Sequence, residues 1–220
     1  KLLANGEMAI NALRLDNSQG EISASKRLTV EVQDAITNMT GKLLANDDVQ
    51  INAHTFDNTE GEISTSKQLN IQVEDAVTNT TGKLLANNDV QISAGMLNNS
   101  QGEISTGTQL RIQTQAQDAL TTTAGKLLAN GNIQINARTL DSSHGEIVSA
   151  KRLTIQTQGA ITSIAGHLLA NDDVQINAEA LNNTQGEIST GGQLNVQTLG
   201  STINTAGKLL ANDGIHIGTE

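Results

Sequence analysis

Titratable residues of the kind that serve as general acids and bases recur along this 220-residue chain at near-constant spacing. Lysine and glutamate alternate at intervals of 20 or 21 residues, with a single interval of 23. The series consists of Lys1, Glu21, Lys42, Glu62, Lys83, Glu103, Lys126, Glu146, His167, Glu187 and Lys208. General acid–base catalysis needs titratable side chains, such as those of His, Glu, Asp or Lys, placed beside the reacting atoms. An active site gathers different groups at one place, whereas this series repeats one pair along the whole chain.

Histidines and paired aspartates, the other common catalytic and metal-binding residues, are scattered. The histidines are His54, His144, His167 and His216. They fall at different positions of the repeat, so no nucleophile, base and orienting group come together. The pairs Asp47-Asp48 and Asp172-Asp173 offer a loose cation site at most, because the calcium-binding nonapeptide of toxin repeats is absent. We therefore expect no enzymatic activity, no metal and no cofactor.

Composition narrows the class of protein further. The chain has no Pro, Cys, Trp or Tyr, a single phenylalanine (Phe56) and a formal net charge of −10. A core without aromatic side chains has to be narrow and filled by aliphatic residues. An acidic chain without clustered Lys and Arg is a poor partner for nucleic acid. No apolar run is long enough to span a bilayer.

An internal repeat defines the elements that position these residues. The phrase GKLL, once GHLL, begins at Gly41, Gly82, Gly125, Gly166 and Gly207. The phrase GEIS, once GEIV, begins at Gly20, Gly61, Gly102, Gly145 and Gly186. The two alternate, so the unit is 20 or 21 residues long and occurs about eleven times. We expect one array over residues 1–220, a fragment of a longer shaft, with two extra residues forming a bulge or short loop within Gln113–Asp118.

Within each unit, apolar and polar residues alternate, which is the period of a β-strand. Glycine and segments such as Asn46-Asp47-Asp48 and Asp57-Asn58 are expected to turn the chain between strands. Three short strands per coil are stable only when stacked on their neighbours, so we predict an all-β parallel β-helix, a solenoid. Parallel crossovers are right-handed, and we predict a right-handed coil; the left-handed helix of hexapeptide repeats fits the unit less well.

Stacking assigns roles to the inward and the charged positions. Leu43, Val49 and Ile51 each begin an inward column of aliphatic residues. The lysine and glutamate series becomes a ladder of alternating charge, in which neighbouring strands bring opposite charges together. Exposed ion pairs contribute little stability, so we expect the ladder to fix the register of the coils. A second ladder is expected around Arg27 and Asp48.

Asparagines recur at a turn near the end of the units. They are Asn17, Asn38, Asn58, Asn79, Asn99 and Asn183, with Ser142 as an exception. Asparagine tolerates left-handed backbone and bonds its own main chain. We predict that these residues build the turns and form hydrogen bonds from coil to coil. Chance sequons at Asn38, Asn79, Asn98 and Asn182 overlap this set.

Two outward rows have no evident structural task. The second leucine of each phrase gives Leu3, Leu44, Leu85, Leu128, Leu169 and Leu210, interrupted by serines and by Val148. This row is a candidate lateral contact surface. A row of amides comprises Asn52, Gln72, Gln113, Asn136, Gln156, Asn177 and Gln197. It is either a carbohydrate or partner surface or, as we prefer, a solvated face whose amides bond one another.

The units G-x-L-x-A-N-x-x-V-x-I-x-A-x-x-x-x-N and G-E-I-S-x-x-x-x-L-x-I-x resemble filamentous haemagglutinin repeats along the whole chain. Such repeats build the shafts of large exoproteins that Gram-negative bacteria secrete by the two-partner pathway, including filamentous adhesins and contact-dependent growth-inhibition exoproteins. The resemblance implies a right-handed β-helical stalk displayed at the cell surface. It also implies an outer-membrane transporter as partner during export. Contacts with host or neighbouring cells would be made through other regions of the full protein.

The expected function is therefore that of a rigid shaft that presents a distal binding or toxin region. Two alternatives stay open. One is a carbohydrate-active β-helix enzyme, similar in fold to the polysaccharide lyases; the near-constant unit length counts against it, because such enzymes interrupt their repeats with long loops. The other is direct binding of a glycan or partner by the amide row.

Overall fold

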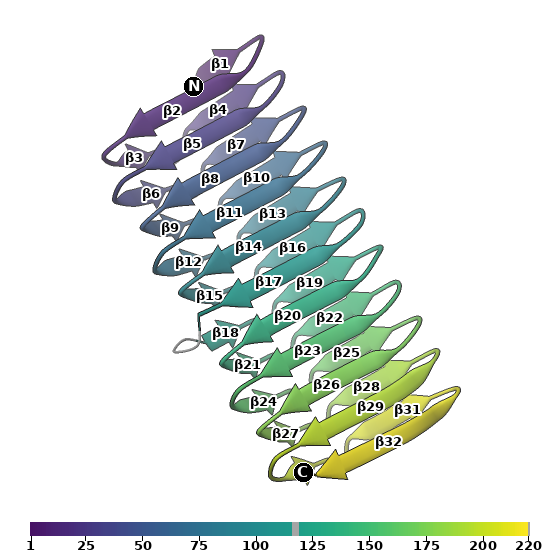
Figure 1. The fold of residues 1–220 in the computed structure, drawn as a ribbon. Helices are drawn as coiled ribbons and strands as arrows, with labels where there is room; N and C mark the ends of the chain where they lie inside the picture. The colour runs from purple at the N-terminus through teal and green to yellow at the C-terminus, as the bar shows by residue number, and fades with distance from the viewer. Residues whose placement is uncertain (116–118, 220) are drawn as a thin grey trace.

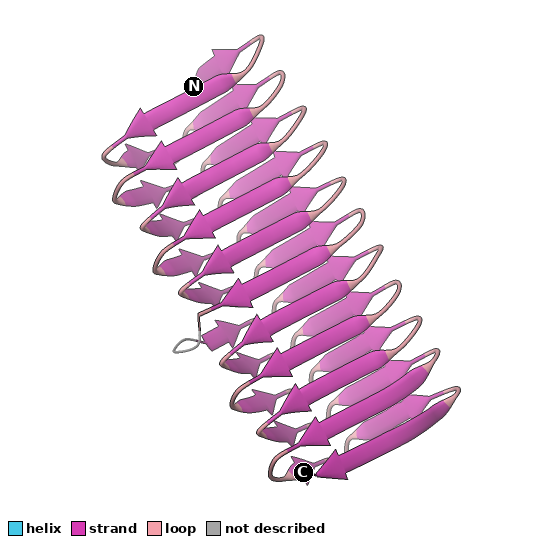
Figure 2. Ribbon diagram, viewed as in Figure 1, coloured by secondary structure: helices cyan, strands magenta, loops and turns pink. Residues whose placement is uncertain are grey.

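The computed structural model describes residues 1–115 and 119–219. Strands and turns wind into a solenoid of stacked coils, and no described residue lies in a helix (Figures 1 and 2). In Figure 1 the near strands run from right to left and the paler, far strands return from left to right while the chain descends from its N-terminus. The coil is therefore right-handed, and the predicted all-β parallel β-helix is confirmed.

Equivalent strands of successive coils pair in parallel into three sheets, which we name A, B and C. Sheet A consists of β1 (Leu2–Ala4), β4 (Glu21–Ala24), β7 (Lys42–Ala45), β10 (Glu62–Thr65), β13 (Lys83–Ala86), β16 (Glu103–Thr106), β19 (Lys126–Ala129), β22 (Glu146–Ser149), β25 (His167–Ala170), β28 (Glu187–Thr190) and β31 (Lys208–Ala211). Sheet B consists of β2 (Met8–Ala12), β5 (Leu28–Val32), β8 (Val49–Ala53), β11 (Leu69–Val73), β14 (Val90–Ala94), β17 (Leu110–Thr114), β20 (Ile133–Ala137), β23 (Leu153–Thr157), β26 (Val174–Ala178), β29 (Gln193–Thr198) and β32 (Gly214–Thr219). Sheet C consists of β3 (Leu15–Asp16), β6 (Ala35–Thr37), β9 (Thr55–Asp57), β12 (Ala76–Thr78), β15 (Met96–Asn98), β18 (Ala119–Thr121), β21 (Thr139–Asp141), β24 (Ala160–Thr162), β27 (Ala180–Asn182) and β30 (Thr202–Ile203).

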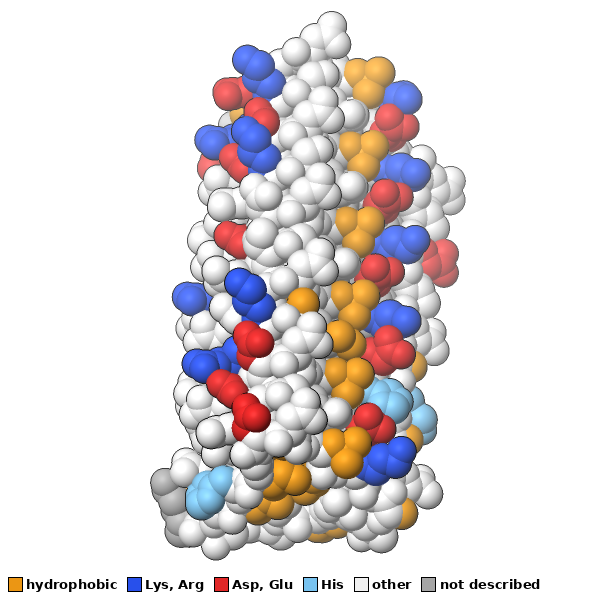
Figure 3. Space-filling model, turned by 90° about the vertical axis from the view of Figure 1, so that its right-hand side faces the viewer, with side chains coloured by type: hydrophobic (Ala, Val, Ile, Leu, Met, Phe, Trp, Pro, Cys, Tyr) orange, Lys and Arg blue, Asp and Glu red, His pale blue; other side chains and the backbone are white. Residues whose placement is uncertain are grey.

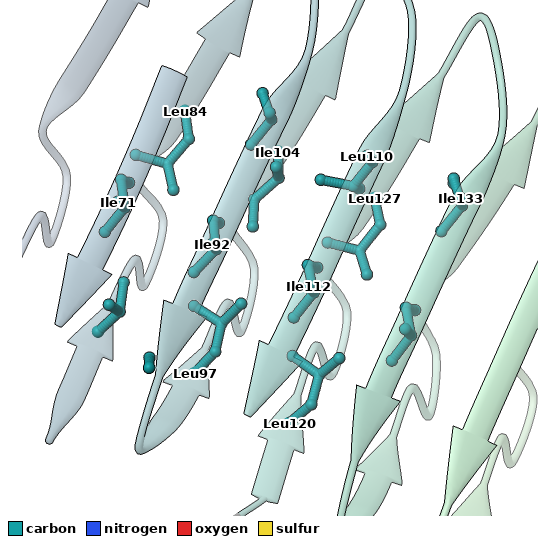
Figure 4. Close-up of a cluster of buried hydrophobic side chains, with 14 of the residues drawn as sticks. Ile71, Leu84, Ile92, Leu97, Ile104, Leu110, Ile112, Leu120, Leu127 and Ile133 are labelled. Carbon is teal, nitrogen blue, oxygen red and sulfur yellow. The ribbon is translucent and has the colours of Figure 1, made fainter. Parts of the chain in front are cut away.

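The alternation of side chains along each strand produces the core. In β8, Val49, Ile51 and Ala53 are buried while the residues between them face outward. Ile51 lies directly opposite Ile71 of the next coil, so equal positions form unbroken columns, as predicted. Figure 4 shows these columns from all three sheets meeting inside the coil. Burial of each such side chain contributes roughly 1.5–3 kcal/mol relative to exposure.

The tenth of the eleven coils departs from the pattern where the sequence does. Thr202 lies opposite the buried Leu181, and the apolar Ile203 is displaced to the outward position opposite Asn182. Ile203 is accordingly exposed. The expected loop within Gln113–Asp118 falls in part on residues 116–118, which lie outside the described residues.

Candidate functional site

A chain of buried asparagines runs along the turn that follows sheet C. In successive coils, Nδ2 of one asparagine donates to Oδ1 of the next at 2.7 Å. The donors and acceptors are Asn17 to Asn38, Asn38 to Asn58, Asn58 to Asn79, Asn79 to Asn99, and Asn183 to Asn204. The amide of Asn79 also donates to the carbonyl oxygen of Gly82 in its own turn, at 3.2 Å. Each amide therefore holds its own turn closed and ties it to the next coil.

The glycines of these turns permit the coils to approach. A Cβ added at Gly82 would overlap the carbonyl oxygen of Asn58 and lie 2.5 Å from Asn79 Oδ1. Gly82 closes the turn, as expected, through its N–H donating to the carbonyl oxygen of Asn79, but its backbone has no positive φ. Glycine is needed here because no side chain fits between two coils.

The left-handed residue of each turn is the one that precedes the glycine. The asparagine, which tolerates this backbone, does not adopt it here. The residues before the glycines have φ between 51° and 58°. They are Gln19, Thr40, Glu60, Thr81, Gln101, Ala124, His144, Ala165, Gln185 and Ala206. Left-handed backbone at a non-glycine residue is uncommon. The sequence shows no preference for Asn, Asp or Gly at this position, so it gave no signal for the turn geometry.

The asparagine ladder has a gap at Thr122, Ser142 and Ser163, which are all fully buried. Asn99 donates to Thr122 Oγ1 at 3.2 Å, where the ladder ends. On the far side of the gap, Ser163 Oγ and Asn183 Oδ1 are buried without a hydrogen-bond partner. Ser142 Oγ reaches the carbonyl oxygen of Thr162 in the next coil, at 3.5 Å, and does not bond to Ser163 Oγ.

Replacement of Ser163 by Asn is expected to stabilise the protein by about 1 kcal/mol, because a second amide would donate to Asn183 Oδ1, which now has no partner. The matched control is Ser163→Ala, which leaves that oxygen unpaired and is expected to change stability little. Chemical denaturation of both variants measures the difference. A Ser163→Asn protein that is less stable than Ser163→Ala would show that the gap has no room for an amide.

On sheet A, the residue after each glycine forms a column of alternating charge. Glu62 lies between Lys42 and Lys83 in the strand register, and the same order runs from Lys1 to Lys208, with His167 between Glu146 and Glu187. Ion pairs join Lys1 to Glu21 (3.0 Å), Lys42 to Glu62 (3.5 Å), Lys126 to Glu146 (3.1 Å) and Lys208 to Glu187 (3.6 Å). Within the described part of the chain, Lys83 forms no ion pair. All four lysines of these pairs are more than half exposed, so each pair contributes at most about 1 kcal/mol.

The turn between sheets A and B carries further ion pairs. Arg27 pairs with Asp48 at 3.0 Å and Lys67 with Asp47 at 2.6 Å. The hydrogen bond and the charge of Asp47 raise the pKa of Lys67 above its usual value. Near the other end, Arg152 pairs with Asp173 at 2.8 Å.

The pKa of Asp173 is lowered because its carboxylate accepts hydrogen bonds from the backbone N–H of Gln193 and from Arg152. The stability that these contacts of the Asp173 carboxylate contribute is present above the unfolded-state pKa of Asp173, and it is lost as pH falls through the folded-state pKa.

Two further side-chain pairs lie outside these ladders and had no sequence signal. They are Arg14 with Asp34 at 2.6 Å and His54 with Glu74 at 3.2 Å.

The second leucines lie on the outer face of sheet A, one position from the charged column (Figure 3). Their strand partners are serines, as where Ser64 lies between Leu44 and Leu85, except at Val148. Leu3 is 62% and Leu210 46% exposed, and the leucines between them are partly exposed. None of the described residues covers this column, which lies at the surface in Figure 3.

The amide row lies on the outer face of sheet B, where Ser93 interrupts it between Gln72 and Gln113, and it lines a groove beside the corner to sheet C. The wider part has a volume of about 830 Å³ and includes Asn52, Gln72, His54 and Glu74. A second part, of about 430 Å³, includes Gln113, Asn136, Gln156 and Asn177. Among the described residues, no hydrogen bond joins amides of neighbouring coils, so the expected amide ladder is absent, and Asn52 Oδ1 has no partner.

Residues 1–115 and 119–219 contain no group of three His, Asp or Glu placed to hold a metal ion.

The sequon asparagines Asn38 and Asn79 are fully buried in the asparagine ladder. At Asn98 and Asn182, the side-chain oxygen accepts hydrogen bonds from Ser100 and Thr184, respectively.

Comparison with known families adds the identity of the repeat. The model of the haemagglutinin repeat matches residues 1–38, 35–80, 68–128, 114–162, 128–209 and 188–219. The chain belongs to the haemagglutinin repeat family. Haemagglutinin repeats and the observed β-solenoid fit a segment of a filamentous adhesin shaft, a structural repeat of a secreted or cell-surface adhesin. Searches of curated proteins and of solved structures returned no match. None of the described haemagglutinin repeats contains a helix long and apolar enough to cross a membrane.

Proposed function

We propose that this chain is a rigid shaft segment of a secreted exoprotein, which holds a distal binding or toxin region away from the cell that anchors it. The observation that carries the proposal is the unbroken parallel register of sheets A and B, in which eleven strands follow one another in each sheet. Because every interior coil is hydrogen-bonded on both sides, bending requires many hydrogen bonds to break together. At about 4.8 Å per coil, eleven coils extend for about 50 Å.

The route of export is part of this proposal. A solenoid folds by adding one coil to the next, which suits a chain that leaves an outer-membrane transporter progressively. Display on the outer surface of a Gram-negative cell and the transporter partner rest on the resemblance of the repeats. The shaft is proposed to be non-enzymatic, because charged residues such as Lys42 and Glu62 form ion pairs between coils.

A length variant of the complete exoprotein tests the shaft role. Deletion of residues 41–81 removes two coils and joins Thr40 to Gly82, which re-creates the Thr–Gly junction of the intact repeat. We expect export, folding and tip activity to persist, with a rod about 10 Å shorter by electron microscopy. Loss of target-cell binding in an exported, folded and correctly shortened variant would contradict a pure spacer.

The groove on sheet B favours a second candidate, direct binding of an extended glycan. Among the described residues its amides form no hydrogen bonds with one another, and they recur in successive coils along the axis, interrupted by Ser93. Gln72→Ser, Gln113→Ser and Gln156→Ser together are expected to abolish retention on polysaccharide columns if the groove binds glycans. Unchanged retention would remove this candidate, whereas depolymerisation of a polysaccharide would indicate an enzyme.

A further inference from the structure

The outer face of sheet A carries two periodic columns side by side. One column alternates lysine and glutamate, and the other alternates leucine and serine. The two alternations are locked together: a coil with lysine has leucine, and a coil with glutamate has serine. The exceptions are His167, which replaces lysine in the coil of Leu169, and Val148, which replaces serine in the coil of Glu146. We call this surface the leucine face. Leucine side chains protrude from every second coil, about 10 Å apart, and serines leave gaps between them.

This pattern is complementary to itself in one orientation. Consider a second copy turned about a two-fold axis that lies in the contact plane, perpendicular to the solenoid axis and midway between two coils. Each column then faces its own copy with the direction reversed. A coil with Lys and Leu meets a coil with Glu and Ser, so leucine enters a gap and opposite charges face each other. The charged column and the leucine column both fit at the same position of the two-fold axis, because they alternate with the same two-coil period.

Other orientations lack this fit. In a parallel pair related by a two-fold axis along the solenoid, equal coils meet and the order of the two columns across the face is reversed, so the leucine column and the charged column cannot both face their own copies. An antiparallel pair with its axis through a coil places lysine on lysine and leucine on leucine. Like charges in direct contact are unfavourable, and protruding side chains that meet tip to tip keep the faces apart.

We propose that the leucine face binds a second copy of this chain in antiparallel orientation, with each leucine seated over a serine of the partner, except for the one leucine that faces Val148. The contact is isologous, as in most symmetric dimers. Each contact is small, and the exposed ion pairs give orientation more than affinity. The association therefore strengthens with the number of coils that overlap.

The proposed shaft role gives this geometry a biological setting. Shafts that rise from two facing cells meet in antiparallel orientation, whereas shafts on one cell run parallel. The setting rests on the proposed function, but the pairing itself is a property of residues 1–220 and is tested separately from it.

Sedimentation analysis of the chain over a range of concentrations tests the pairing. We expect a reversible monomer–dimer equilibrium that weakens as salt is added, because the facing charges are screened. The double variant Ser64→Leu, Ser105→Leu fills two gaps and is expected to lower the association constant about tenfold. The control Gln91→Leu adds an exposed leucine on sheet B and is expected to leave it unchanged. Stronger association of the double variant would indicate a generally adhesive apolar surface and overturn the proposal, as would a monomer at all concentrations.

Cross-linking determines the orientation, because the chain has no native cysteine. Facing sheets lie about 10 Å apart, so a short bismaleimide is the suitable reagent. A protein with Ser23→Cys is expected to cross-link to one with Leu169→Cys or Leu210→Cys, near the opposite end. Preferential cross-linking to Leu44→Cys, its neighbour in a parallel pair offset by one coil, would overturn the antiparallel arrangement.

Discussion

Gly82→Ala is expected to destabilise the solenoid by about 3 kcal/mol or more, which is large for the addition of one methyl group. The new Cβ would overlap the carbonyl oxygen of Asn58 in the preceding coil and crowd Asn79 Oδ1. Both neighbours are fixed, since Asn58 and Asn79 are fully buried in the hydrogen-bonded ladder. The only relief is separation of two coils, which would break the bond from Lys83 N–H to the Gly61 carbonyl oxygen at 2.8 Å.

Gly6→Ala is the matched control, because a Cβ there meets no atom within 4 Å. We expect it to be neutral or slightly stabilising, through reduced freedom of the unfolded chain. Hydrogen exchange is the appropriate measurement, since a repeat array opens locally. Amides of the coils around residue 82 should exchange faster in Gly82→Ala and remain protected in Gly6→Ala. Equal protection in the two variants would mean that the coils separate at little cost.

Asn79→Ala is expected to lower the free energy of unfolding by about 3 kcal/mol. The change removes three hydrogen bonds and leaves a buried acceptor without a partner. Asn79 accepts from Asn58, donates to Asn99 and donates to its own turn at Gly82. After truncation, Asn99 Oδ1 is buried without a donor. Asn79→Ser is expected to cost less, because serine and threonine already occupy this position in three coils.

A double-mutant cycle separates the ladder from the individual turns. If the amides act as a connected ladder, Asn79→Ala and Asn99→Ala together should cost less than the sum of the two single changes, by about 0.5–3 kcal/mol. A distant pair, Asn38→Ala with Asn183→Ala, should be additive. Strict additivity of the neighbouring pair, measured by denaturation, would show that each asparagine serves only its own turn.

The asparagine ladder depends on the close approach of the coils that the glycine column permits. The amide bridges two turns only when their backbones are close, and they are close only because no Cβ intervenes. This explains why the glycine is kept in coils where serine or threonine has replaced the asparagine, as at Gly145 beside Ser142. The spacing of the coils is set by backbone hydrogen bonds, which every coil shares.

The charge ladder and the leucine column both result from the alternation of two kinds of unit. Stability of the core requires only one kind, since Leu43 and Ile63 fill equivalent inward positions. Alternation of Lys42 with Glu62 gives the register a preference that the core lacks, because a slip by one coil would bring like charges together. The same alternation makes the outer face of sheet A complementary to its own copy.

The sequence by itself determined the solenoid, its three strands per coil and its inward columns. These features depend on the period of two along a strand and on the 20- or 21-residue repeat, both of which are visible in the order of residues. Strand partners such as Ile51 and Ile71 follow from that period alone.

Only the tertiary structure decided the roles of the turn residues and the outer surfaces. The close approach at Gly82, the left-handed residue before each glycine and the unpaired Asn183 Oδ1 depend on atoms of the next coil, some 20 residues away. The amides of sheet B remain apart and line a groove, although their spacing in sequence is that of a ladder. A repeat states which residues are equivalent, but distances of a few ångströms between coils decide whether equivalent side chains bond to one another or are left for a partner.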